Sequence, residues 1–480
     1  MTRRQPPCPF PASAVDPAAV SEPQSLTSEW LGARLEALIG PLRGRTLCVA
    51  FSGGLDSSVL LAALSPLRSR RRLSVRALHV NHQLHPHAQR WADAAGAQAR
   101  RLRVPFERID APVVRRRGES LEAAARAVRY RALGSHLRSG QLLLTAHHQE
   151  DQLETVLLAL LRGSGVRGLC AMAAVTPWSG TLLLRPLLPL ARAQLEQYAR
   201  AQALAWSEDP SNQDERFDRN YLRQRVLPLI RQRWPAAAAT VSRSASHLAE
   251  ARALLEQLSL EQLRAARDGE ALRVSVLSRL TAAQRGNALR QWIAERGLAA
   301  PDHRRLREIA GPMLHSRADA LPVVRWQGGE LRRHGDRLFA LHGPAAPPAA
   351  RFWDWRAQPW LTLEGGAALG LVREPHGDVR LGALPPRLRV SFRQGGERLQ
   401  GARGRVALKT LLQAHGLPPW EREAVPLLGD GERIIAVADL WLDPAYRAGG
   451  AAGATGAIGA VAAAGDAGRF RWRRASSDRD

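Results

Sequence analysis

The sequence predicts an α/β protein in which a mostly parallel sheet with helices on both faces is followed by a helical domain and a small α+β domain. Short apolar runs at 47–51, 76–80 and 141–146 predict buried strands, and each run is followed by sequence with helical periodicity. Strands that alternate with helices are typical of parallel sheets. Because such sheets bind ligands beyond the carboxyl ends of their strands, we expect the functional residues where these runs end.

Changes in composition along the chain predict five parts. A leader rich in Pro, Ala and Ser precedes the α/β domain, whose first helix pattern begins at Ser28. A mainly helical segment with short strands near its end follows, and then, after a Pro/Ala linker, a compact α+β domain. We expect the Ala/Gly-rich tail to be flexible and dispensable. In order, the leader, the three domains and the tail are residues 1–27, 28–235, 236–343, 351–447 and 448–480.

The net charge favours a polyanionic partner. The chain of 480 residues has 69 Lys and Arg against 44 Asp and Glu, a formal charge of +25. A surplus of this size is typical of proteins that bind nucleic acid or an anionic membrane surface. Lys409 is the single lysine, however, so a coding bias towards Arg, Ala and Gly is the alternative explanation.

Cysteine usage and hydropathy exclude several classes of protein. Cys8, Cys48 and Cys170 are the three cysteines, and no CxxC pair exists. A disulfide framework and a zinc or iron–sulfur site of the CxxC type are therefore excluded. No apolar run is long enough to span a bilayer, and the N-terminus lacks the apolar core of a secretory signal. The sequence predicts a cytoplasmic protein without a membrane partner.

The string FSGGLDSS (51–58) lies between a predicted strand and a predicted helix. Its two glycines allow a tight turn whose N–H groups face an anion, its serines add donors, and the helix adds the positive end of its dipole. This is a phosphate-binding loop without the Walker GxxxxGK[ST] pattern. Asp56 would suit a Mg²⁺ ion that bridges phosphate oxygens. The alternative is a Ser/Gly turn in which Asp56 caps the helix.

A second motif, AHHQEDQLET (146–155), follows the third predicted strand. Asp151 and Glu154 are three residues apart, so both carboxylates lie on one face of the first helical turn. Such a pair can hold a magnesium ion, hold a substrate ammonium group or accept a proton. The alternative is that Asp151 caps the helix and Glu154 is a favourable first-turn charge.

These motifs resemble those of a known family. SGGLDS resembles the pyrophosphate loop (PP-loop) of the ATP pyrophosphatases, which cleave ATP to AMP and pyrophosphate. AHHQEDQLET resembles the HHxxDxxET motif of the tRNA(Ile)-lysidine synthetases. Further similar segments follow in the family's order between Thr46 and Leu442, at 80–82, 119–130, 162–169, 185–188, 208–228 and in the C-terminal domain.

The resemblance implies an ATP-dependent ligase that joins L-lysine to carbon 2 of the wobble cytidine in the CAU anticodon of an isoleucine tRNA. The reaction would pass through an adenylated tRNA and release pyrophosphate and AMP, with ATP and Mg²⁺ bound at the loop. The C-terminal domain would contact the tRNA, and a homodimer is left open. The implied residues are Ser52, Gly53, Gly54, Leu55, Asp56 and Ser57 for ATP, Asp56 also for the metal, Asp56, Arg126, Asp151 and Glu154 for catalysis, and Asn212, Arg219, Asn220 and Arg223 for tRNA.

The sequence departs from the family after the second strand, where Gln83, Leu84 and His85 stand in place of the usual Gly-Leu-Arg. Nearby histidines have poor spacing for a zinc site, so we expect loop histidines near a nucleotide. One rival function is a PP-loop tRNA thiolase, which would need catalytic or cluster-binding cysteines near the loop. Another is a non-catalytic, Arg-rich RNA-binding protein, which would lack Ser52, Asp56 or the two helix carboxylates. Because all of these are present, we favour the ligase.

Overall fold

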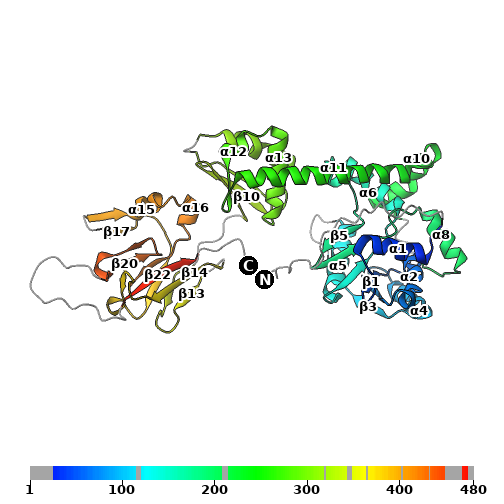
Figure 1. Cartoon of the computed structure of the whole chain (residues 1–480), viewed down its shortest axis with the longest axis horizontal. Coiled ribbons are helices and arrows are strands. Elements are labelled where there is room, and N and C mark those ends of the chain that lie inside the picture. The colour runs from blue at the N-terminus through cyan, green and yellow to red at the C-terminus, as the bar shows by residue number, and fades with distance from the viewer. Residues whose placement is uncertain are drawn as a thin grey trace, which may run out of the picture. The chain divides into compact units, whose positions relative to one another are not determined.

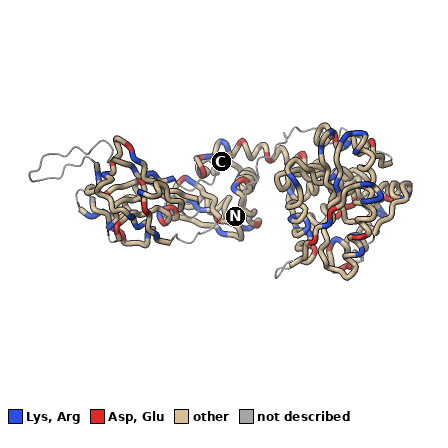
Figure 2. The backbone as a smooth tube through the Cα atoms, turned by 90° about the horizontal axis from the view of Figure 1, so that it is seen from below, with Lys and Arg blue, Asp and Glu red and all other residues tan. Residues whose placement is uncertain are grey.

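The computed structural model describes residues 25–114, 120–207, 214–317, 320–342, 349–363, 366–401, 404–431, 433–448 and 467–473 (Figure 1). The chain divides into two compact units, Met1–Leu255 and Glu256–Asp480. Lys and Arg positions are spread through both units rather than gathered in one (Figure 2). Within the described residues, no helix is both long and apolar enough to cross a membrane.

The first unit alternates strands and helices. Its helices are α1 (Ser28–Ile39), α2 (Leu55–Leu64), α3 (Leu67–Arg70), α4 (Ala88–Arg101), α5 (Leu121–His136), α6 (Gln149–Leu161), α7 (Val166–Leu169), α8 (Arg192–Ala201), α9 (Asp218–Tyr221), a π-helical turn (Leu222–Val226), α10 (Leu227–Arg233) and α11 (Ala237–Ala266), which runs on into the second unit. Its strands are β1 (Thr46–Ala50), β2 (Ser74–Asn81), β3 (Phe106–Asp110), β4 (Gln141–Leu144), β5 (Val175–Trp178) and β6 (Thr181–Leu184).

These strands form one sheet in the order β3-β2-β1-β4-β6-β5, in which only β5 is antiparallel to its neighbour. Both faces are buried, which explains why the strands are continuous apolar runs. Leu47 and Val49 of β1 pack in the core formed with α1, α2, α4 and α8, whereas Cys48 between them packs in the core formed with α5. The predicted parallel sheet with helices on both faces is confirmed.

The strand order determines where a ligand site can form. Strand β1 pairs with β2 on one side and with β4 on the other, and all three strands run in the same direction. The chain therefore leaves β1 and β4 at the same edge of the sheet, on either side of the point where the strand order reverses. Crevices at such points bind ligands in open α/β sheets. The glycine loop follows β1 and the second motif follows β4, so both motifs meet here.

The second unit contains antiparallel sheets. One has the order β7-β8-β11-β10-β9 and packs on α13 and α14. The middle segment thus contains more strand than the sequence predicted, because β7 and β8 add to the expected strands over 322–342. Its elements are β7 (Arg267–Asp268), β8 (Ala271–Arg273), α12 (Val274–Ser278), α13 (Ala282–Glu295), α14 (His303–Glu308), a π-helical turn (Ile309–Met313), β9 (Val323–Trp326), β10 (Gly329–His334) and β11 (Arg337–Leu341).

Beyond residue 350, the chain forms sheets of order β12-β16-β19-β20-β21 and β13-β14-β22-β15 and a β17-β18 hairpin. The elements are β12 (Arg351–Trp353), β13 (Trp360–Thr362), β14 (Ala368–Arg373), β15 (Val379–Arg380), a 3-10 turn (Leu381–Ala383), β16 (Leu388–Ser391), β17 (Arg398–Gly401), β18 (Gly404–Ala407), α15 (Leu408–Ala414), α16 (Pro419–Arg422), β19 (Leu427–Gly429), β20 (Ile434–Val437), β21 (Trp441–Leu442), a 3-10 turn (Pro444–Tyr446) and β22 (Ala467–Arg473).

Strand β22 corrects the prediction that 448–480 is a flexible tail, which is wrong for residues 467–473. The strand pairs with β14 from Gly468 to Arg473 and with β15 at its start. Phe470 is buried in the domain core. Gly377 lies so close to β22 that a Cβ there would come within 2.2 Å of the Gly468 carbonyl oxygen. Removing 448–480 would therefore open this sheet, and we no longer expect the tail to be dispensable.

Phe470→Ala should destabilise the full chain by about 3–5 kcal/mol, because it deletes a large buried ring from a packed core. Urea denaturation followed by fluorescence measures the loss. The matched control on the same strand is Arg469→Gln, whose ion pairs of 3.7 Å to Glu374 and 3.8 Å to Asp378 are partly exposed and should be worth about 0–1 kcal/mol. Equal effects of the two substitutions would place Phe470 outside the core.

Candidate active site at the carboxyl ends of β1 and β4

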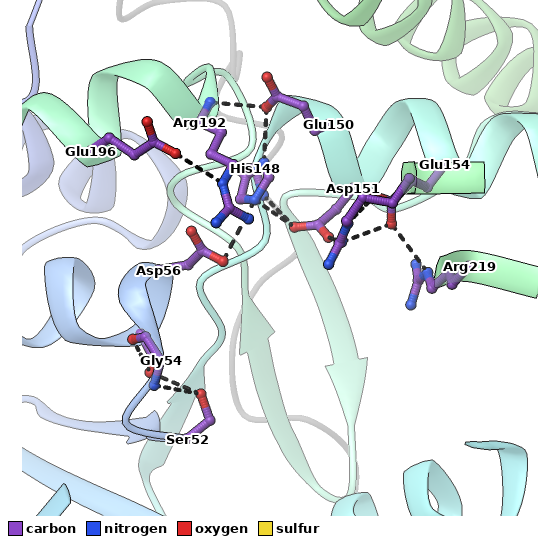
Figure 3. A network of polar contacts seen from close by, with 12 residues as sticks. Ser52, Gly54, Asp56, His148, Glu150, Asp151, Glu154, Arg192, Glu196 and Arg219 are labelled. Carbon is purple, nitrogen blue, oxygen red and sulfur yellow. Dashed lines mark hydrogen bonds and ion pairs between the residues drawn. The ribbon is translucent and has the colours of Figure 1, made fainter. Parts of the chain in front are cut away.

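The glycine loop is held in a fixed shape between β1 and α2 (Figure 3). Gly53 has a φ of +84°, and a Cβ there would come within 3.2 Å of the Ala95 Cβ, so this turn requires glycine. The Ser52 hydroxyl lies 3.0 Å from that of Ser57 and accepts a hydrogen bond of 3.3 Å from the Gly54 N–H. Helix α2 has no side-chain cap at Gly54, which leaves its first N–H groups available to an anion.

Asp56 lies in the first turn of α2, beside the loop. Its Oδ1 is buried and has no hydrogen-bond partner among the described residues. Its Oδ2 lies 3.6 Å from Nε2 of His148. An unpartnered carboxylate oxygen next to a phosphate-binding loop fits a divalent cation. Among the described residues, no three or more His, Cys, Asp or Glu side chains form a cluster suited to a metal ion.

His148 joins the two motifs. It is the residue before α6, its ring is buried, and three carboxylates surround it (Figure 3). Nδ1 lies 3.0 Å from Glu150, and Nε2 lies 3.5 Å from Asp151 and 3.6 Å from Asp56. Burial by itself would lower the pKa of His148, but the charge of Asp151 and the contacts with Asp56 and Glu150 outweigh it and raise the pKa to about 10. The imidazole is therefore an imidazolium at neutral pH.

Asp151 and Glu154 lie on one face of α6, as predicted, but in different surroundings. Asp151 accepts a hydrogen bond of 3.0 Å from the His148 N–H, so it caps the helix while its side chain stays 15% exposed. Burial favours the neutral acid, yet the charge of His148 keeps the pKa of Asp151 below its usual value. Glu154 has no exposed side-chain surface, and burial raises its pKa against the opposing effect of Arg223.

Arg219 and Arg223, expected to contact the tRNA backbone, lie against these carboxylates. Arg223 donates two hydrogen bonds to Glu154, of 2.8 and 3.0 Å, and lies 3.5 Å from Asp151. Arg219 lies 3.6 Å from Glu154 and donates a hydrogen bond of 2.9 Å to Thr155. The π-helical turn carries Arg223, and such turns often occur at functional sites. The two guanidinium groups close off Glu154.

The comparisons with known proteins agree with these motifs. Family models match in chain order: a PP-loop domain at 28–230, a TilS substrate binding domain at 272–339 and a TilS substrate C-terminal domain at 388–456. A tRNA(Ile)-lysidine synthase of Alkalilimnicola ehrlichii is 45% identical over 413 residues, which cover 85% of this chain and 92% of that protein. The chain belongs to the tRNA(Ile)-lysidine synthase family. The resemblance inferred from the motifs is confirmed.

Other members of the family are similar over the same extent. The tRNA(Ile)-lysidine synthase of Methylococcus capsulatus is 40% identical over 415 residues, or 83% of this chain and 92% of that protein. The one from Pseudomonas aeruginosa is 43% identical over 414 residues, or 82% of this chain and 89% of that protein. The aligned residues thus make up most of this chain and most of each relative.

Two of the residues implied by the family lie apart from the carboxylates. Arg126 of α5 places its guanidinium 5.1 Å from the centre of the Tyr130 ring and, among the described residues, makes no ion pair with the loop or the carboxylates. It is close enough to contribute to the lowered pKa of His147. Asn220 donates a hydrogen bond of 3.0 Å to the Asp214 carbonyl. Asn212 lies outside the described residues.

The histidines around the departure from the family pattern have separate partners. The Nδ1 of His79 lies 2.9 Å from the Phe51 carbonyl oxygen, which supports the backbone entering the loop. Burial lowers the pKa of His79, which keeps it neutral. Gln83 takes a left-handed φ of +56°, the region that the family's glycine would favour, and its N–H bonds to Asn81 Oδ1. The His85 ring stacks on the ring of Trp91.

The cysteines give no support to a thiolase. Cys48 and Cys170 are both buried, and burial raises the pKa of Cys48 to about 11. A thiol in this state is a poor nucleophile at neutral pH. Cys8 lies outside the described residues. Among the described residues, therefore, no accessible thiol faces the loop.

The ionisation of the two adjacent histidines can be tested by NMR. Burial and nearby guanidinium groups, Arg185 first, outweigh Asp151 and lower the pKa of His147 to about 3. Between about pH 5 and pH 8.5 the His148 ring should stay protonated and the His147 ring neutral, in full-length protein labelled at histidine. His147→Gln and His148→Gln assign the two signals.

The raised pKa of His148 makes the stability of the folded chain depend on pH. Because the pKa of His148 is raised from 6.5 to about 10 in the folded chain, its proton stabilises the fold fully below about pH 6.5. That stability is lost as the pH rises through about 10. If the His148 signal instead titrates near the ordinary histidine pKa of 6.5, the ring is not a stable cation at neutral pH, and the buried imidazolium at the centre of this site is contradicted.

Proposed function

We propose that the chain ligates L-lysine to carbon 2 of the wobble cytidine in the CAU anticodon of an isoleucine tRNA, with ATP as the activating substrate. One observation carries the proposal: His148 brings Asp56 of the pyrophosphate loop and Asp151 of the lysidine-synthetase motif to one point. Residues that would grip the triphosphate and residues that would receive an amine thus share one site.

The first step activates the cytosine. Its carbonyl oxygen at carbon 2 is a poor leaving group, so it attacks the α-phosphate of ATP, forms an adenylated base and expels pyrophosphate. The Gly53–Gly54 backbone, the start of α2 and the hydroxyls of Ser52 and Ser57 hold the departing pyrophosphate. A Mg²⁺ ion held by Asp56 supplies positive charge to the phosphate oxygens when it is bound.

The second step forms the carbon–nitrogen bond. The ε-ammonium of lysine gives a proton to the carboxylate that holds it, the free amine attacks carbon 2, the bond from carbon 2 to the adenylate oxygen breaks, and AMP leaves. Lysine reaches the site as an ammonium, which needs a carboxylate with an accessible oxygen. The Asp151 side chain is 15% exposed, whereas the Glu154 side chain is fully buried and its oxygens are taken by Arg223 and Arg219. We therefore assign the ammonium to Asp151, and to Glu154 the role of holding the two arginines in place.

The charged groups around this point fit an RNA substrate. Arg126 and Arg185 both lower the pKa of His147, so positive charge is concentrated beside the motif. We propose that Arg126 offsets charge that develops on the adenylated base. Arg219 and Arg223 would contact the nucleotide entering the site, and Asn212 and Asn220 the adjoining backbone. The C-terminal domain would contact the rest of the tRNA. The wobble base has to leave its stack to reach the loop.

The function is tested by incubating the protein with ATP, Mg²⁺, labelled lysine and isoleucine tRNA transcript, and scoring label in the RNA. We expect label in the CAU transcript and none in a transcript whose wobble cytidine is replaced by uridine. A thiolase would leave lysine unused and require a sulfur donor. Incorporation that survives replacement of the wobble cytidine would contradict the proposed substrate.

Asp151→Asn should raise the KM for lysine about 10- to 150-fold, because a charged hydrogen bond is worth about 1.5–3 kcal/mol. The same variant should keep its KM for ATP within a few-fold. Initial rates at varied lysine and varied ATP measure both constants.

Glu154→Gln is the matched comparison. It removes the charge that Arg219 and Arg223 contact, and because both arginines are partly exposed the loss should cost about 1.5–3 kcal/mol. We expect a lower melting temperature and a loss of both half-reactions. A selective rise in the KM for lysine, with an unchanged melting temperature, would assign the ammonium to Glu154 instead of Asp151.

A further inference from the structure

Neither half-reaction uses Glu150, although this residue contacts the histidine at the centre of the site. It stands at an open position of the HHxxDxxET motif, so the resemblance to the family assigns it no role. Its side chain is 13% exposed and lies at Nδ1 of the His148 ring, whereas Asp56 and Asp151 lie at Nε2 (Figure 3). Glu150 therefore holds the ring from the nitrogen that does not face the two carboxylates of the reaction.

The carboxylate of Glu150 links the ring to two further helices. Its Oε2 lies 3.0 Å from Nδ1 of His148 and accepts a hydrogen bond of 2.9 Å from the N–H of Arg192, the first residue of α8. Its Oε1 lies 3.6 Å from the Arg231 guanidinium of α10. The N–H groups at the start of a helix lack partners within the helix and favour negative charge, so α8 helps to fix the carboxylate in place.

Helix capping alone does not account for Glu150. The N–H of His148, where α6 begins, already donates a hydrogen bond of 3.0 Å to Asp151. Helix α8 likewise has a capping bond of its own, in which the N–H of Ala191 donates to Oε1 of Gln194 at 2.8 Å. Because both helix starts have other caps, the feature that sets Glu150 apart is its contact with the imidazole ring.

The backbone beside Glu150 is held by the segment that follows the RPLL string (185–188). The N–H of Gln149 donates a hydrogen bond of 2.9 Å to the Leu190 carbonyl oxygen, and its side-chain amide donates one of 2.5 Å to that of Pro189. Leu190 is fully buried in the core beneath the sheet. A carboxylate on a backbone held in this way can keep the ring that it contacts in one orientation.

We propose that Glu150 is a positioning residue, which orients the His148 ring so that its Nε2 faces Asp56 and Asp151 at the same time. A buried carboxylate that holds an imidazole by Nδ1 fixes the orientation of the ring in other enzymes. The two carboxylates need a fixed separation, because the base is activated beside Asp56 and meets the amine beside Asp151. The inference rests on the proposed function, since that function requires both carboxylates in one site.

Glu150→Gln keeps the size of the side chain and an oxygen that can accept from the Arg192 N–H, but it removes the charge at Nδ1. A misplacement of about 1 Å can cost about 100-fold in rate, so we expect kcat for pyrophosphate release and for lysine transfer to fall about 10- to 100-fold. The KM values for ATP and lysine should stay within a few-fold, because Glu150 touches neither substrate. Initial rates of the full-length protein with the CAU transcript measure all four constants.

Glu196→Gln is the matched control. Glu196 pairs with the side chains of Arg192 and Arg200, at 3.2 and 3.9 Å, and is 38% exposed. It thus contacts the same arginine as Glu150 but acts on the opposite side of that residue from the ring contact, and its variant should keep the rates of the wild type. In protein without substrates, the Nδ1–H proton signal of His148 should move upfield in Glu150→Gln and stay in place in Glu196→Gln.

A double-mutant cycle separates positioning from a merely structural role. If Glu150 acts through the ring, Glu150→Gln should cause no further loss of kcat in a His148→Gln background. Additive losses, a lower melting temperature with an unchanged kcat, or an unmoved His148 signal would overturn the inference. So would a selective rise in the KM for lysine, which would place Glu150 against the substrate. Wild-type protein that incorporates no lysine, with the His148 signal moved as expected, would refute the proposed function instead.

Discussion

The buried imidazolium of His148 is the interaction on which this site depends. A buried charge is costly unless it is paired, and here Asp56, Glu150 and Asp151 surround it. Asp56 comes from the helix after β1 and Asp151 from the helix after β4. The His148 imidazolium contacts both carboxylates and so holds the two sides of the crevice together. The parallel pairing of β1 with β4 is what makes this possible, because it places both helix starts at one edge of the sheet.

This arrangement separates two tasks within a small space. The loop and Asp56 face the phosphates, and Asp56 keeps an unpartnered oxygen for a cation. The Asp151 side chain is partly exposed on the other side of His148, whereas Glu154 is closed off by arginines. In the proposed reaction the base is activated at the loop and meets the amine at Asp151. The product of the first step then has only a short distance to move before the second.

Much of the fold was predictable because it depends on local patterns. Apolar runs followed by helical periodicity located the parallel strands, and the i, i+3 spacing placed Asp151 and Glu154 on one face. The role of His148 was not predictable, since its partners Asp56 and Asp151 come from helices far apart in the sequence. Spacing on a helix also could not show that Arg219 and Arg223 fold back onto Glu154. A signal for β22 was present in the alternation of RFRWR, but the Ala/Gly run before it suggested flexibility.

The most direct test of this account is pyrophosphate release by the wild-type protein in the absence of lysine. If the cytosine is activated first, ATP, Mg²⁺ and the CAU transcript should together release pyrophosphate and leave AMP on the RNA, and omitting the transcript should abolish the release. Lysine added afterwards should discharge the AMP. Pyrophosphate release that requires lysine but not tRNA would mean that the amino acid is activated first, and would contradict the account.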